Sequence, residues 1–279
     1  MDRDEYRRTS LASWDRMASG WERRSAEVEQ VLAPVREWLV RELQPEKGQT
    51  ILELAAGAGD TGFAVASALG DSGRLISTDI SPVMVDVARR RGSELGYRNL
   101  EFRTIDAENL ELEDASVDGV ICRLGYMLMA DAGRALTETR RVLRPGGRLV
   151  LAVWGVAEQN PWSTARTGML IAHGYLAPPE PGGPGPFRLG SEVLLGSAFA
   201  AAGFASVRTE EVPVLFRHPD LDHYVATSMD CVSSFAVAFR ESSEEGRSAM
   251  TQELADSLAP FAVDGGYEIP GVARTAVAS

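Results

Sequence analysis

The sequence predicts an α/β protein built around a mostly parallel, seven-stranded sheet with helices on both faces. The first observation is a regular alternation of short apolar runs and amphipathic segments; the apolar runs are residues 50–55, 74–78, 100–104, 117–122 and 148–154. Strands that alternate with helices at this spacing are typical of βαβ units, which form parallel sheets. The second observation is that the last of these runs is almost continuously apolar, as expected for a strand covered on both faces.

Helical and irregular segments flank this alternating region. With 279 residues, the chain is long enough for one large α/β domain. Within residues 178–186 only Glu180 is neither Pro nor Gly, which excludes regular secondary structure there. The predicted organisation is an N-terminal helical cap over 1–45, a core over 46–154, and the remainder of the same domain over 155–279, with a lid insertion at about 155–190, helices at about 220–238 and 247–258, and a last strand at 272–277.

The composition excludes several classes of protein. The formal net charge of −12 repels phosphate backbones, so no nucleic-acid partner is expected. No apolar run approaches the ~20 residues that span a bilayer. The two cysteines, Cys122 and Cys231, lie far apart and lack metal-ligand spacing. These features predict a cytoplasmic protein without a metal site or membrane contact, and they leave the oligomeric state open, a homodimer included.

A glycine-rich segment follows the first predicted strand and precedes a helix. Residues 57–62 read Gly-Ala-Gly-Asp-Thr-Gly, and Asp79 stands 20 residues after Gly59 at the end of the second strand. Such a segment suits a dinucleotide pyrophosphate, and the acid suits ribose hydroxyls. These two features alone do not separate a nicotinamide dinucleotide from other adenosine-containing cofactors.

Three further features favour a cationic ligand over a dinucleotide. Glu53 lies inside the first strand, where a negative charge suits a cation and disfavours a pyrophosphate. Asp106 and the small Ala107 follow the third strand and offer an acceptor for an adenine amino group. The turn at 143–147, Leu-Arg-Pro-Gly-Gly, has no role in nicotinamide binding.

Together these motifs resemble those of the class I S-adenosyl-L-methionine (SAM) methyltransferases, and within them the ubiquinone/menaquinone C-methyltransferase-like (methyltransferase type 11) branch. The likeness covers about residues 14–154 and implies a Rossmann-like fold with SAM as cofactor. The segments that carry it are 51–59, 78–84, 106–107, 117–123 and the Pro-Gly-Gly turn.

The resemblance implies roles for individual residues. Asp79 is expected to bind the ribose hydroxyls, and Ile80 and Met84 are expected to enclose the adenine, which Asp106 and Ala107 recognise. The other residues assigned to the cofactor are Glu53, Gly57, Gly59, Cys122 and Arg123, together with Ala55.

Two of these cofactor assignments carry a condition. Ala55 occupies a position usually held by Gly, so a left-handed backbone there predicts weak cofactor affinity. For Trp21, two interpretations stay open: it covers the methionine end of the cofactor, or it is a core tryptophan.

The acceptor is predicted from the end of the fourth strand and from the variable region. Residues 122–125 read Cys-Arg-Leu-Gly and lack the Asn/Asp-Pro-Pro-aromatic pattern that nucleobase and amine N-methyltransferases resemble. We therefore expect methyl transfer to carbon or oxygen of a small, aromatic or partly apolar molecule, as in a bacterial tailoring enzyme of secondary metabolism. The predicted substrate contacts are Met127, Trp154, Trp162 and Tyr175.

Two residues are candidates for a general base. A base with a pKa near neutrality aids transfer to oxygen or to an acidic carbon, which favours a histidine. His173 lies in the expected lid, and Tyr126 follows the fourth strand by a few residues. Alternatives also remain: an N-methyltransferase of a small amine, a SAM-binding protein without activity, and an NAD(P)-dependent oxidoreductase, although the Tyr-x-x-x-Lys pair of its commonest single-domain class is absent.

Overall fold

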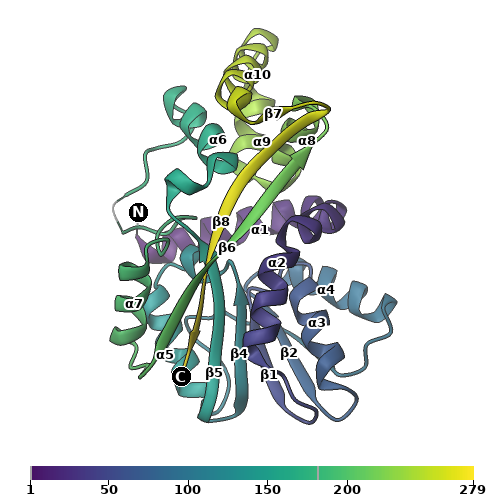
Figure 1. Cartoon of the computed structure of the whole chain (residues 1–279), viewed down its shortest axis with the longest axis vertical. Coiled ribbons are helices and arrows are strands. Elements are labelled where there is room, and N and C mark those ends of the chain that lie inside the picture. The colour runs from purple at the N-terminus through teal and green to yellow at the C-terminus, as the bar shows by residue number, and fades with distance from the viewer. Residues whose placement is uncertain (1, 181) are drawn as a thin grey trace.

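An eight-stranded sheet forms the centre of the computed structural model, which describes residues 2–180 and 182–279 (Figure 1). The strand order is β3-β2-β1-β4-β5-β8-β6, and β7 pairs only with β8. Strands β1 to β5 pair in parallel, whereas β8 runs antiparallel to both β5 and β6. The strands are β1 (Thr50–Leu54), β2 (Arg74–Asp79), β3 (Leu100–Thr104), β4 (Val117–Arg123), β5 (Leu143–Trp154), β6 (Val207–His218), β7 (Ala262–Val263) and β8 (Gly266–Ala278).

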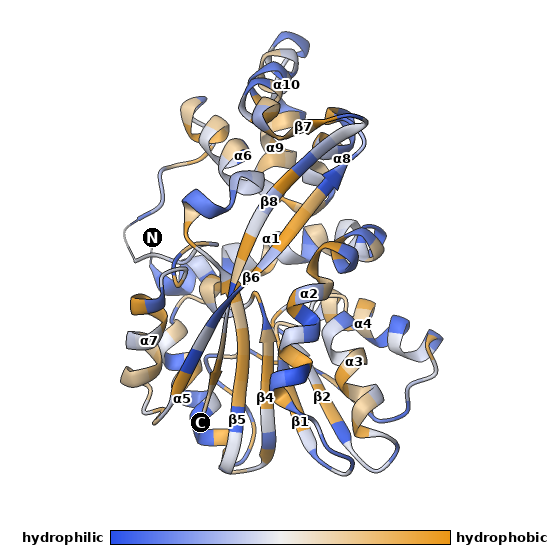
Figure 2. Ribbon diagram, viewed as in Figure 1, coloured by the Kyte–Doolittle hydropathy of each residue, from blue (hydrophilic) through white to orange (hydrophobic). Residues whose placement is uncertain are grey.

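This architecture confirms the predicted mostly parallel α/β sheet. Consecutive residues of β1 and of the second half of β5 are buried, so both faces of these strands are covered. Figure 2 shows the hydrophobic residues along β5 in orange. The two-residue β7 is additional to the seven predicted strands. The helices are α1 (Arg3–Arg23), α2 (Ser25–Leu43), α3 (Asp60–Leu69), α4 (Pro82–Glu94), α5 (Ala132–Val142), α6 (Pro161–Ala172), α7 (Glu192–Ala201), α8 (Leu221–Cys231), α9 (Ser233–Glu241) and α10 (Glu244–Leu258).

Polar caps fix where several helices begin. Ser81 accepts a hydrogen bond from the backbone N–H of Met84, and Pro82 occupies the first turn of α4, where a missing N–H costs nothing. At the start of α8, Asp220 accepts from the N–H of His223 at 2.7 Å. These local signals explain where α4 begins and why the predicted helix start at about 220 agrees with that of α8.

The β6–β8 hairpin extends beyond the sheet and carries a second hydrophobic core. Strand β5 pairs only with residues 273–278 of β8, whereas β6 follows β8 back to Tyr267. Helices α6, α8, α9 and α10 pack around the extended part of the hairpin (Figure 1). We call these helices the upper lobe. The buried residues of its core are Met169, Leu170, Tyr224, Phe235, Ala238, Met250, Leu254, Leu258 and Ile269.

Three predicted boundaries in this half of the chain are wrong. The helix expected at 220–238 is interrupted at Val232, whose extended backbone separates α8 from α9. The last strand begins at Gly266 rather than 272, because its first half pairs with β6 and β7 and not with β5. The turn expected at 144–147 is part of β5, next to an irregular register between β4 and β5.

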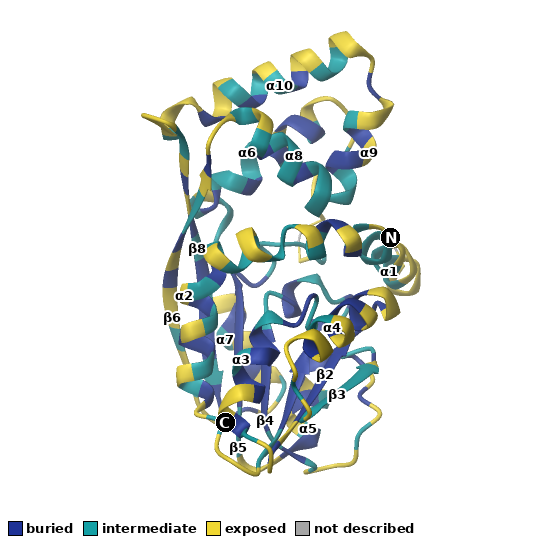
Figure 3. Ribbon diagram, turned by 90° about the vertical axis from the view of Figure 1, so that its right-hand side faces the viewer, coloured by how far each residue is buried: buried dark blue, intermediate teal, exposed yellow. Residues whose placement is uncertain are grey.

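Helix α1 lies between the sheet and the upper lobe, and in Figure 3 it runs beneath α8 and α9. It packs closely on α8, because a Cβ atom on Gly20 would stand 2.0 Å from the backbone oxygen of Asp230. Across the residues that the structure describes, no helix combines the length and apolar character needed to cross a membrane.

Candidate active site

A cavity lies at the carboxyl ends of the parallel strands, beneath α1. The ends of β1, β2 and β4 and the loop after β3 supply its floor, and α1 and α2 supply the opposite wall. Strand β1 stands between β2 and β4, so the order of connection reverses here. In open α/β sheets, ligands bind at such a point.

The glycine-rich loop brings the backbone close to this cavity. Gly59 has φ +92° at the start of α3, and a Cβ atom there would lie 2.5 Å from the ring of Phe63. Gly57 also has a left-handed backbone, φ +56°, but a Cβ atom there would meet no protein atom within 4 Å. Since Gly57 lines the cavity, its open side leaves room for a ligand against the backbone.

Two non-glycine residues with left-handed backbones adjoin the loop. Ala55 has φ +52° and Leu124 has φ +63°, at the ends of the paired strands β1 and β4. A Cβ atom on Gly125 would stand 2.6 Å from the Cβ of Ala55, so the methyl group at 55 is accommodated by a glycine at 125. Ala55 therefore has the left-handed backbone for which the sequence predicts weak cofactor affinity, and the weak affinity itself stays a prediction.

Glu53 is a buried carboxyl group on the cavity wall. Its side chain is only 2% exposed and accepts a hydrogen bond from the Ser77 hydroxyl at 2.8 Å. Desolvation by burial raises the pKa of Glu53 to about 8, which the hydrogen bond from Ser77 only partly offsets. A ligand with positive charge beside Glu53 would favour its ionised form.

Asp79 joins the glycine loop to the start of α4. Its two carboxylate oxygens accept from the backbone N–H of Gly57 at 3.0 Å and from that of Ser81 at 2.9 Å. Burial raises the pKa of Asp79 above its usual value. Each oxygen retains a lone pair toward the cavity, which suits hydroxyl donors such as those of a ribose.

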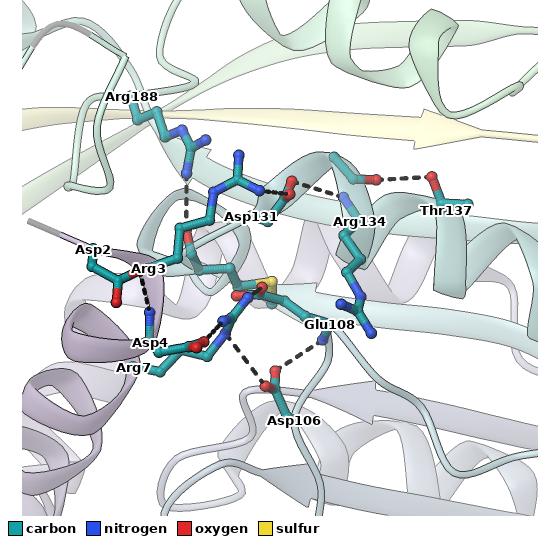
Figure 4. A network of polar contacts seen from close by, with 12 residues as sticks. Asp2, Arg3, Asp4, Arg7, Asp106, Glu108, Asp131, Arg134, Thr137 and Arg188 are labelled. Carbon is teal, nitrogen blue, oxygen red and sulfur yellow. Dashed lines mark hydrogen bonds and ion pairs between the residues drawn. The ribbon is translucent and has the colours of Figure 1, made fainter.

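The N-terminal turns of α1 close the cavity on the side of the β3 loop (Figure 4). The Arg7 guanidinium pairs with Glu108 and lies 3.8 Å from Asp106. The Tyr6 hydroxyl donates to the carbonyl of Leu128 at 2.8 Å, and Arg3 pairs with Asp131. These contacts, all made by the first two turns of α1, hold the helix across the loops that follow β3 and β4.

Two buried polar atoms on the cavity wall lack a hydrogen-bond partner in the protein. The Thr61 hydroxyl, in the first turn of α3, and Nε of Arg7 make no hydrogen bond. Orphaned polar atoms are costly in a dry interior, so they indicate a polar ligand or bound water. With the acids and the open side of Gly57, they fit a cationic nucleoside such as SAM.

Most of the residues predicted to bind the cofactor lie together around this cavity. Those that line it are Trp21, Glu53, Ala55, Gly57, Asp79, Ile80, Met84, Asp106, Ala107 and Arg123. Gly59 and Cys122 are not on its wall: Gly59 shapes the turn, and the Cys122 side chain is fully buried. The ring of Trp21 lies 6.0 Å from that of Trp14, which also faces the cavity.

The structure places neither candidate for a general base on the cavity wall. His173 ends α6 at the surface of the upper lobe, where its Nε2 lies 2.8 Å from Glu253 and away from the cavity wall. Tyr126 is completely buried, its hydroxyl lies 2.5 Å from that of Thr139, and burial raises its pKa. The sequence placed both near the site in chain order, but their side chains point elsewhere.

The four predicted substrate contacts also lie off the cavity wall. The sulfur of Met127 accepts from the backbone N–H of Trp154, and both residues are buried in the main core. Trp162 packs on Trp154 with 4.6 Å between ring centroids. Tyr175 is exposed on the upper lobe and bonds to Ser242. None of the four lines the cavity, and their contact with a substrate stays a prediction.

Sequence reasoning missed the wall supplied by α1 and α2. Tyr6, Arg7 and Ser10 of α1 line the cavity, as do Ser25, Val28 and Leu32 at the start of α2. Tyr6, Ser10, Trp14 and Trp21 recur at helical spacing, so one face of a helix was visible in the sequence. That spacing does not reveal what the face covers.

The comparisons with known proteins agree with the motifs. The model of the ubiE/COQ5 methyltransferase family matches residues 34–165. The chain is 40% identical over 77 residues to a demethylmenaquinone methyltransferase of Deinococcus radiodurans, which covers 28% of the chain and 32% of that relative. It is 41% identical over 75 residues to the ubiquinone/menaquinone biosynthesis C-methyltransferase UbiE of Acidiphilium cryptum, covering 26% and 30%. The chain thus spans about a third of the length of the curated relatives it matches.

A solved structure extends the likeness to most of the fold. The YcgJ protein of Bacillus subtilis superposes with a TM-score of 0.61 at 18% identity, covering 87% of the chain and 96% of that protein. At this identity the similarity shows the fold alone. The match over residues 34–165 makes the chain similar to the ubiE/COQ5 methyltransferase family, in agreement with its motifs, and the solved structure shares its fold.

Proposed function

We propose that this chain transfers a methyl group from SAM to carbon or oxygen of a small, aromatic or partly apolar acceptor. The observation that carries the proposal is the set of acids around one cavity. Glu53, Asp79 and Asp106 stand at the carboxyl ends of β1, β2 and β3, in the positions that the motifs assign to three parts of the cofactor.

Each of these groups has a role matched to its chemistry. Asp79 would accept hydrogen bonds from the ribose hydroxyls, and Asp106 would accept one from the adenine amino group. Glu53 and the aromatic faces of Trp14 and Trp21 would stabilise positive charge at the methionine end.

Catalysis in this proposal depends on alignment and exclusion of water. When bound, SAM would supply an electrophilic methyl group. The chain's own contribution is to hold donor and acceptor in line beneath α1, which can supply ~7–11 kcal/mol of the barrier. Within residues 2–180 and 182–279, no histidine lines the cavity. We therefore infer an acceptor that is already nucleophilic, such as a phenolate or an electron-rich ring carbon.

The curated relatives favour carbon as the acceptor atom. The Acidiphilium relative is described as a C-methyltransferase of ubiquinone and menaquinone biosynthesis. We propose a quinol-like or phenolic ring as acceptor and do not favour an amine. The apolar side chains of Val28, Leu32 and Leu128 on the cavity wall suit such a ring.

Turnover with methyl-labelled SAM tests the proposal. The protein is incubated with hydroquinones, phenols and primary amines, and products are identified by mass spectrometry and NMR. We expect a methyl group on carbon or oxygen, and loss of turnover in Asp79→Asn. Methylated amines alone would contradict the proposal. No product from any acceptor, despite binding of S-adenosylhomocysteine (SAH), would instead support a SAM-binding protein without activity.

A further inference from the structure

Arg166 is a buried cation in the upper lobe whose contacts are a hydroxyl group and an aromatic ring. The residue is 7% exposed, donates one hydrogen bond to the Ser228 hydroxyl at 3.1 Å and lies over the ring of Trp162 at 5.9 Å. Throughout the part of the chain that the structure describes, no carboxylate forms an ion pair with it. A guanidinium carries five donors and stays charged, so burial without a counter-charge is costly.

Two acids share the electrostatic surroundings of Cys231 with Arg166, and both are paired with other cations. Asp230 accepts from Arg23 at 2.5 Å and from Arg24 at 2.7 Å. Glu27 pairs with Arg24 at 3.0 Å and lies 3.4 Å from the ring of His223. Arg23 and Arg24 thus engage both carboxylates, and neither carboxylate forms an ion pair with Arg166.

Two hydrogen bonds to α8 connect Arg166 with the wall of the cavity. Trp21, which lines the cavity, donates from Nε1 to the carbonyl of Cys231 at 3.2 Å. Ser228 precedes Cys231 by three residues on α8, and residues at this spacing are neighbours on a helix surface. A molecule that extends from the cavity past Trp21 toward the upper lobe would approach the guanidinium.

The surroundings of Arg166 offer it no other charged partner. The Tyr224 hydroxyl donates to the backbone carbonyl of Trp162 at 2.8 Å. The ring of His218 lies 3.0 Å from that of His223, and burial lowers the pKa of His218 to about 4, so it is neutral at physiological pH. Hydroxyls and an aromatic face leave the positive charge without an anion.

We propose that Arg166 binds an anionic group of the methyl acceptor, either a carboxylate or a phosphate. This inference rests on the proposed methyl transfer, and it names the substrate class: an aromatic or partly apolar acid whose charged end reaches the upper lobe. The planar fork of a guanidinium matches two oxygens of either anion, and a neighbouring aromatic ring suits the apolar part.

Isothermal titration of the whole protein, saturated with SAH, tests the inference. Saturation with SAH fills the cofactor site, so the probes cannot bind where the carboxylate of the cofactor binds. The probes are benzoate, phenyl phosphate and the neutral benzamide. We expect at least one anion to bind tenfold or more tightly than benzamide, as a charge-assisted pair allows. Whichever of benzoate and phenyl phosphate binds more tightly shows whether the site prefers a carboxylate or a phosphate.

Two variants test whether Arg166, and not another arginine, causes the preference for an anion. Arg166→Gln should abolish the preference for the anion, and Arg240→Gln, an exposed arginine on α9, should keep it. Equal binding of benzamide and both anions to the unsubstituted protein would overturn the inference, even if Arg166→Gln failed to fold. So would an anion preference that survives in a folded Arg166→Gln. SAH binding in the same samples tests the proposed function separately.

Discussion

Glu53 is the residue whose environment depends most directly on the charge of the ligand. Its pKa of about 8 in the folded protein exceeds the ~4.3 of an unfolded glutamate, so folding favours the protonated acid. The stability that this group contributes is complete below about pH 4 and is lost as the pH rises toward 8. Without cofactor, Glu53→Gln should therefore raise the thermal midpoint at pH 8 by several degrees and have little effect near pH 5.

The same variant should weaken SAM binding, because the neutral amide cannot balance a cation. Calorimetric melts at pH 5 and pH 8 and a SAM titration measure the two effects. Glu111→Gln, at an exposed position, serves as the control. If Glu53→Gln changed the thermal midpoint by the same amount at pH 5 and at pH 8, Glu53 would already be ionised in the free protein.

Ala55 and Gly125 form a second residue-scale feature. Because a Cβ atom at 125 would overlap both Ala55 and the sulfur of Cys122, Gly125→Ala should destabilise the protein by about 1–3 kcal/mol. Combining it with Ala55→Gly removes one of the two clashes and the left-handed alanine, so about 1 kcal/mol or more should return. Urea unfolding of the four proteins completes the cycle. Strict additivity of the two substitutions would rule out the coupling.

Among the elements, α1 decides how the cavity is closed. Arg7 pairs with the buried Glu108, so Arg7→Met leaves a carboxylate without its partner and frees the first turns of α1. SAH should bind about tenfold more weakly and dissociate faster, as expected for loss of one charge-assisted hydrogen bond. Arg8→Met, on the exposed side of α1, is the matched control. Stopped-flow release of SAH that is equal in the two variants would argue against α1 as a closing element.

At the scale of the elements, some features could be predicted from the sequence and others could not. The loops after β1, β2 and β3 were predictable, because the glycines and acids that shape them are adjacent in sequence to apolar strands. The wall formed by α1 was not, since helical spacing identifies a face but not its partner. Trp162 and Tyr175 were misplaced for a related reason: the length of the β6–β8 hairpin, which carries the upper lobe away from the sheet, depends on long-range pairing.

At the scale of the whole molecule, two hydrophobic cores meet at Trp162 and Phe216, which pack against both. The main core supplies the strand ends that hold the acids of the cavity, and the upper lobe supplies Arg166. Helix α1 contacts α4 beside the sheet and both α8 and α9 of the upper lobe. In the proposed function, the residues at the strand ends would bind the cofactor, and the upper lobe would select the acceptor.

The central claim is that the cavity binds the SAM skeleton through Asp79. Isothermal titration with SAH, with NAD⁺ and NADP⁺ as controls, tests it most directly. We expect SAH alone to bind, and Asp79→Ala to abolish binding while a thermal melt shows that the variant is folded. If NAD⁺ or NADP⁺ bound in place of SAH, or if Asp79→Ala left SAH binding unchanged, the cavity would not bind SAM through Asp79.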